Sequence, residues 1–349
     1  MIMNKKQRGK FGNIILILSA VVALAAALIL FFVYTKPGKK LTSKVVAGYL
    51  HNAINYVPGN GNTENKTPDE ENGDLFEKPV EEIEEGSGEK EYYHILLLGE
   101  EARKTSSGNG RTDTIILATI DVKQKRVILT SVLRDSYVEP EGMNPCKINA
   151  VYAKQRANGL YRILYEKIGV WPDGYVKIGF DSFEEVIDML GGTEVTLTVE
   201  EAQYLNTHDY ISKEEYRNVV PGTQVLNGNQ TLGYCRVRYV PNCNGTKYDY
   251  GRTERQRMVL SNLFERYKDA GITKWVKILN EGLGYIETDI SEDMMEELIY
   301  VVYDGRITKL EQRQIPATGT FQSQDVGKIT STLVIDWEEN KEIFWSILE

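Results

Sequence analysis

The sequence predicts an α/β domain with a mixed central β-sheet flanked by helices, preceded by a single N-terminal transmembrane helix. From residue 92 to residue 349, short apolar runs that suit buried strands alternate with longer segments of helical periodicity. Near the N-terminus, one apolar run is long enough to cross a bilayer. A strongly acidic stretch without apolar periodicity lies between the two. These observations predict an anchor, a linker and one α/β domain.

The apolar run covers residues 14–33, and Ser19 is its one polar side chain. It is longer than the apolar core of a usual signal peptide, and no small-residue cleavage pattern follows Val33. We therefore expect an uncleaved anchor over residues 14–34 rather than a cleaved signal peptide. Basic residues flank both ends of the run, so the positive-inside rule leaves its orientation undecided.

Residues 35–91 are predicted to form a juxtamembrane segment followed by an acidic linker. The part from 57 to 91 carries twelve acidic residues against three lysines, a composition typical of a solvated, extended chain. The whole protein has a net charge of −9. Because non-specific nucleic-acid binding requires neutralisation of phosphates, we expect no nucleic-acid partner.

Three apolar runs at the start of the domain, residues 94–98, 114–120 and 126–133, are predicted strands. The short segment 121–125 suits a hairpin between the last two. If the second strand (114–120) also lies beside the first (94–98), the beginning of the second strand lies next to the ends of the first and third strands. Further along, we expect helices over 160–168 and 181–190, the second ended by Gly191-Gly192, and strands over 175–178 and 194–198.

The segment 235–239 alternates arginine with apolar or aromatic residues, which predicts a strand with Arg236 and Arg238 on one face. Thr253 and Gln256 have the spacing of a capping box, so a helix is expected to begin there and to end near Gly271. This would place Arg252, Arg255 and Gln256 in a first helical turn, which favours an anion.

Arginine is concentrated in a few segments, with carboxylates between the guanidinium groups. Five arginines fall between residues 236 and 257, and Asp249 lies among them. Arginine binds phosphate through a planar fork, and interleaved carboxylates suggest a hard cation. The pattern predicts a phosphate-ester or pyrophosphate site. The predicted strand order would bring further charged residues to the same sheet edge: Glu101, Arg111, Asp113, Arg134 and Asp135.

Several common catalytic patterns are absent from the sequence. There is no glycine-rich dinucleotide fingerprint and no phosphate-binding loop ending in Lys-Ser/Thr. The three histidines have neither metal spacing nor a nucleophile signature beside them, which argues against a zinc enzyme or a Ser-His-Asp hydrolase. Three cysteines cannot all be bridged internally. A Cys146–Cys243 disulfide is possible outside the cell, but the spacing does not decide it.

Over about residues 92–349 the chain resembles the LytR-CpsA-Psr family. The resemblance is carried by eight motifs in the family's order, at residues 94–103, 111–118, 131–135, 147–150, 191–192, 226–228, 236–238 and 249–256. It implies a single-pass protein of the cell membrane with a cytoplasmic tail (residues 1–13) and an extracellular catalytic domain (residues 92–349). It also implies a mixed sheet between helices, with a hydrophobic tunnel for a prenyl chain.

The activity implied by the resemblance is a phosphotransfer. A glycopolymer such as teichoic acid or capsule would move from a polyprenyl-pyrophosphate carrier to a cell-wall acceptor, usually peptidoglycan. A hydroxyl of the acceptor would attack the phosphorus next to the glycan. The alternatives are a lipid-pyrophosphate hydrolase, a membrane-anchored transcriptional regulator and a non-catalytic lipid carrier or wall-binding protein.

The resemblance also assigns residue roles. Asp113 and Asp249 would hold Mg²⁺ (or Mn²⁺) or act on the attacking hydroxyl, and Glu101 stands where the family has a metal-binding aspartate. Arg111 and Gln256 would complete the polar shell. The pyrophosphate ligands would be Arg134, Arg236, Arg238 and Arg252. Three further arginines are interpreted as structural ion-pair partners outside the site: Arg103, Arg255 and Arg257.

Overall fold

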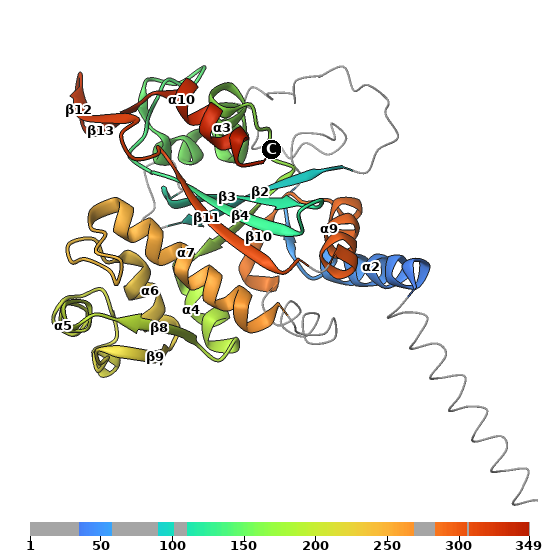
Figure 1. Ribbon diagram of the computed structural model, residues 1–349, viewed down its shortest axis with the longest axis horizontal. Coiled ribbons are helices and arrows are strands. Elements are labelled where there is room, and N and C mark those ends of the chain that lie inside the picture. Colours follow the sequence, from blue (N-terminus) through green and yellow to red (C-terminus); the bar gives the residue numbers. More distant parts are fainter. Residues whose placement is uncertain (1–34, 58–89, 101–109, 269–282, 306, 349) are drawn as a thin grey trace, which may run out of the picture. The chain divides into compact units, whose positions relative to one another are not determined.

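The computed structural model describes residues 35–57, 90–100, 110–268, 283–305 and 307–348 (Figure 1). By its internal contacts the chain forms two compact units, one of residues 1–49 with 292–306 and one of residues 50–291 with 307–349. The smaller unit contains α9 (Glu292–Gly305) and most of α2 (Lys36–His51), a helix within the segment assigned only as juxtamembrane. In that unit, Lys39 Nζ binds Asp304 Oδ1 at 3.0 Å and lies 5.4 Å from the centre of the Tyr303 ring.

The larger unit is built on a seven-stranded mixed sheet with the order β1-β10-β7-β2-β3-β4-β11. Strands β2, β3 and β4 form an antiparallel meander, while β7 pairs parallel to β2 and β11 pairs parallel to β4. The predicted strand order and hairpin are therefore confirmed. The strands are β1 (Asn55–Tyr56), β2 (Tyr92–Glu100), β3 (Thr112–Asp121), β4 (Arg126–Val132), β7 (Gly174–Gly179), β10 (Ile286–Thr288) and β11 (Lys309–Ile315).

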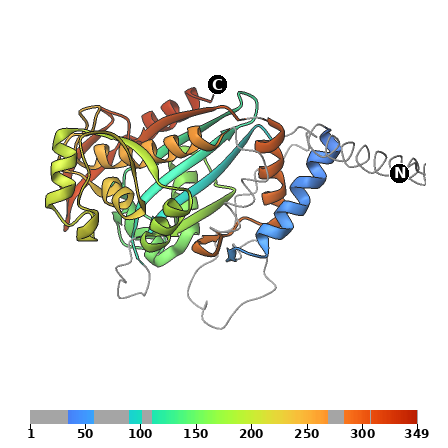
Figure 2. The same cartoon turned by 90° about the horizontal axis from the view of Figure 1, so that it is seen from below.

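Helices cover both faces of the sheet, as predicted (Figure 1). Ile115 and Leu117 belong to the main core with α3 (Val151–Ile168) and α10 (Trp337–Ser346), and their neighbour Ile116 belongs to the core with Leu260 of α7 (Tyr248–Tyr267). This division follows from the alternation of side chains along a strand. Figure 2 views the sheet from below, the side on which α7 lies.

Beyond α7, a second core is formed around a separate two-stranded sheet. Its strands β8 (Thr193–Leu197) and β9 (Gly222–Leu226) pack with helices, and the cluster includes the buried Tyr234 and Val237. The predicted helix and strand boundaries here are close to those observed, and Gly191 and Gly192 end the α4 helix with φ of 77° and 81°. The helices are α4 (Phe180–Met189), α5 (Val199–Thr207) and α6 (Gly228–Arg236).

The remaining described elements are short. A 3₁₀ turn (Ile148–Ala150) leads into α3, and two further 3₁₀ turns lie at Glu214–Tyr216 and Leu283–Tyr285. Two small antiparallel sheets complete the domain, formed by β5 (Tyr137–Val138) with β6 (Cys146–Lys147) and by β12 (Phe321–Val326) with β13 (Ile329–Ile335).

Two local predictions are wrong. The segment 235–239 is not a strand, because α6 continues to Arg236 and the chain is extended only from Val237. The predicted helix start at residues 253–256 lies inside α7, which begins at Tyr248. The alternating pattern of five residues favours a strand less strongly than the capping box at the start of α6 favours a helix. In this capping box the Gln230 backbone amide donates to Asn227 Oδ1, and the Asn227 backbone amide donates to Gln230 Oε1.

Some predictions fall on residues outside those described, namely the apolar run at 14–33, most of the acidic linker, Glu101, Arg103 and the helix end near Gly271. Over the described ranges, no helix has the length and apolar character needed to cross a membrane. The three cysteines are all free, so Cys146 and Cys243 are not bridged.

Candidate active site

Arg134 lies at the centre of a group of charged side chains just beyond the end of β4. Its Nη1 donates to Asp113 Oδ1 at 2.6 Å, and its Nε is 3.6 Å from Asp249 Oδ1. Asp113 is the second residue of β3, which runs antiparallel to β4, so the start of one strand meets the end of the other. The predicted convergence of Asp113 and Arg134 is confirmed.

Asp249, in the first turn of α7, is the carboxylate to which three guanidinium groups turn. Its Oδ1 lies 2.9 Å from Arg252 Nη2, 3.7 Å from Arg238 Nε and 3.6 Å from Arg134 Nε. Arg252 Nη2 also donates to the backbone carbonyl of Asp113 at 3.2 Å. We call these five residues, Asp113, Arg134, Arg238, Asp249 and Arg252, the arginine cluster.

The cluster holds more positive than negative charge in a partly dehydrated place. Burial lowers the pKa of Arg252 to about 10. The positive charges of Arg134 and Arg238 also lower this pKa, while the carboxylates of Asp249 and Asp113 raise it. Burial also acts to lower the pKa of Arg134, but Asp113 and Asp249 outweigh it, and the pKa is raised. An incoming anion would relieve the repulsion among the guanidinium groups.

Several polar atoms of the site are buried without a hydrogen-bond partner in the described part of the chain. They include the Nε atoms of Arg134, Arg238 and Arg252. Asp249 Oδ1 has ion-pair contacts but no hydrogen bond of good geometry, and Gln256 Oε1 also lacks a partner. Unsatisfied buried groups are uncommon in native proteins, and at a functional site a bound ligand can supply the missing partner.

Three further predicted ligands have no hydrogen bond or ion pair to the cluster among the described residues. Gln256 Nε2 donates to the Cys235 carbonyl at 3.3 Å. The Arg236 guanidinium stacks on Phe180, 5.3 Å from the ring centre, and Arg111 is exposed. No ion pair joins Arg111 or Arg236 to the arginine cluster among the described residues. The structure therefore brings together five of the predicted residues and leaves Arg111 and Arg236 as separate cations.

The end of β6 and the 3₁₀ turn after it make contacts next to Arg134. Lys147 Nζ binds Asp135 Oδ1 at 2.8 Å, while Asp135 Oδ2 remains 3.8 Å from Arg134 Nε. The Asn149 amide donates to the Arg134 carbonyl at 3.3 Å. Because Lys147 neutralises Asp135, the Arg134 guanidinium pairs mainly with Asp113 and Asp249. For Lys147 and Asn149 the sequence left a role in the site and a turn or helix-start role equally open.

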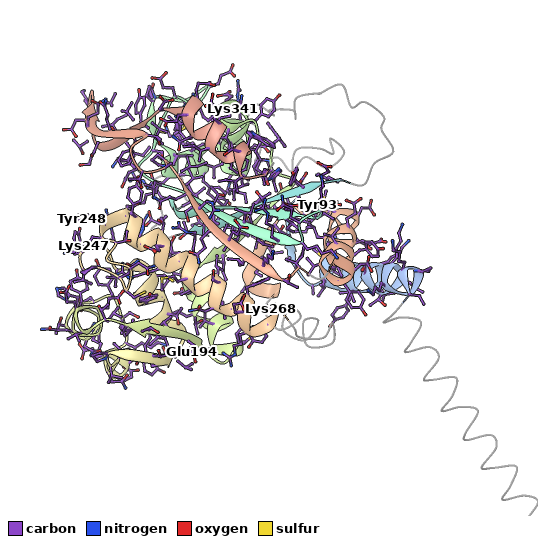
Figure 3. All side chains as sticks on the ribbon, viewed as in Figure 1. Tyr93, Glu194, Lys247, Tyr248, Lys268 and Lys341 are labelled. Carbon is purple, nitrogen blue, oxygen red and sulfur yellow. The ribbon has the colours of Figure 1, made fainter. Side chains whose placement is uncertain are left out.

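The loop that carries Arg238 is held by Arg255. Arg255 Nη1 donates to the Val237 carbonyl at 3.1 Å and Nη2 to the Val240 carbonyl at 2.9 Å. The same loop meets the start of α7, where the Tyr248 amide donates to the Arg238 carbonyl at 2.6 Å; Figure 3 labels Tyr248 and its neighbour Lys247. The interpretation of Arg255 as a structural ion-pair partner is confirmed by its bond to Glu201.

Asp113 and Asp249 fit a divalent cation only as a site shared with a substrate. No group of three or more metal-ligating side chains occurs in the part of the chain that the structure describes. Mg²⁺, however, is usually bound by one or two carboxylates together with substrate phosphates and water. Asp249 Oδ1, which has ion-pair contacts but no hydrogen bond among the described residues, suits that kind of site.

The domain is thus a mixed α/β fold with an arginine cluster at one sheet edge, an arrangement suited to an anionic ligand. The chain belongs to the LytR_cpsA_psr family, which matches residues 58–343. It is 29% identical to Biofilm regulatory protein A of Streptococcus mutans over 70% of this chain and 63% of that protein. It is 30% identical to the polyisoprenyl-teichoic acid--peptidoglycan teichoic acid transferase TagU of Enterococcus faecalis, over 67% of this chain and 73% of that protein.

The fold is shared with TagT of Bacillus subtilis. The crystal structure of that protein is similar with a TM-score of 0.58 and 22% identity, over 76% of this chain and 93% of TagT. TagT has also been solved bound to LI-WTA, and that structure has a TM-score of 0.57 and 23% identity, over 74% of this chain and 90% of TagT.

Proposed function

We propose that this protein transfers a glycopolymer from a polyprenyl-pyrophosphate carrier to a cell-wall acceptor such as peptidoglycan. The observation that carries the proposal is the arginine cluster, in which three guanidinium groups face two carboxylates. Each of these guanidinium groups has an Nε without a hydrogen-bond partner among the described residues. Such an arrangement suits the several negative charges of a pyrophosphate. Membership of a family that includes the TagU transferase supports the same substrate class.

In the proposed reaction an acceptor hydroxyl attacks the phosphorus next to the glycan. A new P–O bond forms to the acceptor oxygen, the bond to the terminal lipid phosphate breaks, and polyprenyl phosphate leaves. Asp113 or Asp249 takes the hydroxyl proton. Phosphoryl transfer is catalysed mainly by positioning and charge stabilisation, and Arg134, Arg238 and Arg252 supply both.

Arg111, Arg236 and Gln256 are proposed as the outer polar shell of the same substrate. When Mg²⁺ or Mn²⁺ is bound, Asp113 and Asp249 hold it and it contributes positive charge against the phosphate oxygens. Glu101, which follows β2, is a further proposed ligand of the cation. The cation therefore belongs to the substrate complex rather than to a site closed by protein side chains.

We place the catalytic domain on the outer side of the cell membrane, with the apolar run at 14–33 as a single-pass anchor and residues 1–13 in the cytoplasm. The wall acceptor and the lipid carrier would both be accessible from that position. The acidic balance of the chain, −9 overall, supports a local anion site rather than a nucleic-acid surface.

The full chain should be incubated with a polyprenyl-pyrophosphate-linked glycan, labelled in the glycan, and with peptidoglycan oligomers, in the presence and absence of Mg²⁺. We expect labelled glycan to become covalently attached to the oligomer by a phosphodiester. Arg134→Ala should slow attachment on the order of 10²-fold or more, while Arg313→Ala, at an exposed position on β11, should not. Free phosphorylated glycan in place of the conjugate would instead establish the hydrolase.

A further inference from the structure

A groove follows β11, the strand at one end of the sheet order, between α7 and α10. Its volume is about 340 Å³. Figure 3 labels Lys341 on α10, close in sequence to the lining residues Asn340 and Ile343. The groove has an apolar part, formed with Ile315 and Phe344, and a polar part lined by Arg257, Gln312 and Gln314. It is distinct from the arginine cluster, none of whose members line it.

Arg257 is a buried cation that forms no ion pair with any residue the structure describes. Only 6% of the residue is exposed, and Nε and Nη1 have no hydrogen-bond partner within the described ranges. The nearest acidic residue along the helix, Glu254, is engaged elsewhere, since it accepts from Asn242 at 2.8 Å and from Asn244 at 2.5 Å. The interpretation of Arg257 as an ion-pair partner is therefore wrong.

The position of Arg257 on α7 directs it toward β11. On the N-terminal side of Arg257 along α7, the Tyr250 hydroxyl donates to the Pro316 carbonyl, just after β11, at 3.5 Å. Another contact lies on its C-terminal side, from Gln312 Nε2 to Ser261 Oγ at 2.7 Å. These contacts fix the helix against the strand on both sides of Arg257, so its side chain is held in the groove by the packing of the two elements.

Keeping an unpaired guanidinium in such a place is unfavourable. Burial lowers the pKa of Arg257 to about 10, and the charge of Glu254 opposes this only in part. A buried charge normally has a counter-charge or a full set of hydrogen bonds. At neutral pH the side chain remains a cation, so what the groove lacks is an anion.

We propose that this groove binds a small amphipathic anion, a carboxylate or phosphate attached to an apolar body. The oxyanion accepts hydrogen bonds from Arg257, and the apolar body packs against Ile315, Ile343 and Phe344. Gln314 lines the polar part and has an amide able to donate to the second oxygen. The groove thus combines one strong polar anchor with an apolar wall, the usual composition of small-ligand sites.

The test is a thermal-shift titration of the full chain with hexanoate, hexyl phosphate and hexan-1-ol, which share one apolar body. We expect at least one of the two anions to reach half-saturation at a concentration at least about tenfold below that of the alcohol, because hydrogen bonds to charged groups are the stronger ones. The better anion identifies the ligand as a carboxylate or a phosphate. Equal binding of the alcohol would overturn the proposal.

Variants assign the effect to the groove. Arg257→Gln should weaken the preferred anion about tenfold, and Arg134→Gln, in the arginine cluster, should leave its affinity unchanged. The reverse result would mean that the anion binds the cluster. Ile343→Trp fills the apolar part from a position that is 36% exposed and leaves Arg257 intact, so it tests the site even if Arg257→Gln fails to fold. Undiminished binding by Ile343→Trp would also exclude the groove.

Discussion

Arg255 and Glu201 form an ion pair, with Nε 2.8 Å from Oε1, in which neither side chain is exposed to solvent. Glu201 belongs to the capping box of α5, and Arg255 binds two carbonyls of the loop that carries Arg238. The pair therefore links the start of α5 to the position of a guanidinium in the arginine cluster. It is a positioning element of the site rather than a ligand.

We expect Glu201→Ala to reduce the free energy of unfolding by about 3–5 kcal/mol, because it leaves the Arg255 charge buried and unpaired. Equilibrium unfolding in urea measures this change. Glu265→Ala is the matched control, since Glu265 pairs with Lys268 on the surface and the loss should be below about 1 kcal/mol. Equal losses in the two variants would show that burial does not determine the strength of the Glu201 pair.

Arg134→Ala should lower the turnover of glycan transfer on the order of 10²-fold or more, since it removes a charge that stabilises the transferring phosphate. Arg134→Lys should recover only part of the rate, because an ammonium cannot contact Asp113 and Asp249 with a planar fork. Single-turnover rates with saturating substrate separate this effect from weaker binding. A rate for Arg134→Ala within a factor of two of the wild type would remove Arg134 from the site.

The Asp249→Asn variant tests whether Asp249 acts only as a counter-ion of the arginines or also as a ligand of the metal ion. Without Mg²⁺, the variant should bind inorganic pyrophosphate more tightly than the wild type, because three guanidinium groups lose an opposing charge. With Mg²⁺, the wild type should gain affinity and the variant should gain little. Isothermal titration calorimetry under both conditions measures the four affinities. An equal gain from Mg²⁺ in both proteins would show that Asp249 does not hold the cation.

His94 should make the protein less stable in acid. Burial lowers its pKa from 6.5 to about 4, with Asp173 opposing and Lys90 adding to the shift. Between these values the unfolded chain binds the proton and the folded protein does not, so stability is highest above pH 6.5 and falls as the pH drops toward 4. The loss is on the order of 3 kcal/mol by pH 4.

Urea unfolding of wild type and His94→Asn at pH 7 and pH 5 isolates this contribution from other titrating groups. The variant should lose less stability between the two conditions. Its side-chain amide keeps the ability to bond Thr119, whose Oγ1 lies 3.0 Å from His94 Nδ1. The same pH dependence in both proteins would show that His94 is not the titrating group.

The three free thiols should differ in reactivity. Burial raises the pKa of Cys235 to about 12 and that of Cys146 to about 11, while Cys243 is exposed with a smaller rise. Because the thiolate is the reactive form, a disulfide reagent at pH 8 should modify Cys243 first and Cys235 only after unfolding. Mass spectrometry of timed samples identifies each site. Early labelling of Cys235 would contradict the buried environment described for α6.

Strands β2, β3 and β4 could be predicted because each is a short apolar run and the connection from β3 to β4 is too short for anything but a hairpin. The meeting of Asp113 with Arg134 follows from that pairing alone. The starts of α6 and α7 could not be predicted in the same way. Cys235 and Val237 look like one face of a strand, but they are buried because a helix ends between them.

The ion-pair partners of the arginines could not be predicted from the sequence either, because ion pairs depend on contacts between segments distant along the chain. Arg255 and Arg257 are two residues apart on one helix and have the same charge. Arg255 faces Glu201 in the second core, whereas Arg257 faces β11 and has no acidic partner within hydrogen-bonding distance among the described residues there. Their different roles follow from the direction each side chain takes from α7, which the sequence does not specify.

Strand β11 comes from the C-terminal part of the chain but completes the sheet beside β4, and the Leu133 amide donates to the Ile315 carbonyl at 2.8 Å next to Arg134. This pairing joins segments far apart in sequence, and such contacts form slowly during folding. A chain still being synthesised therefore exposes the edge of β4 until its last segments emerge. The edge of the sheet that carries the arginine cluster is assembled late, so a product truncated before β11 would lack this edge and be prone to aggregation.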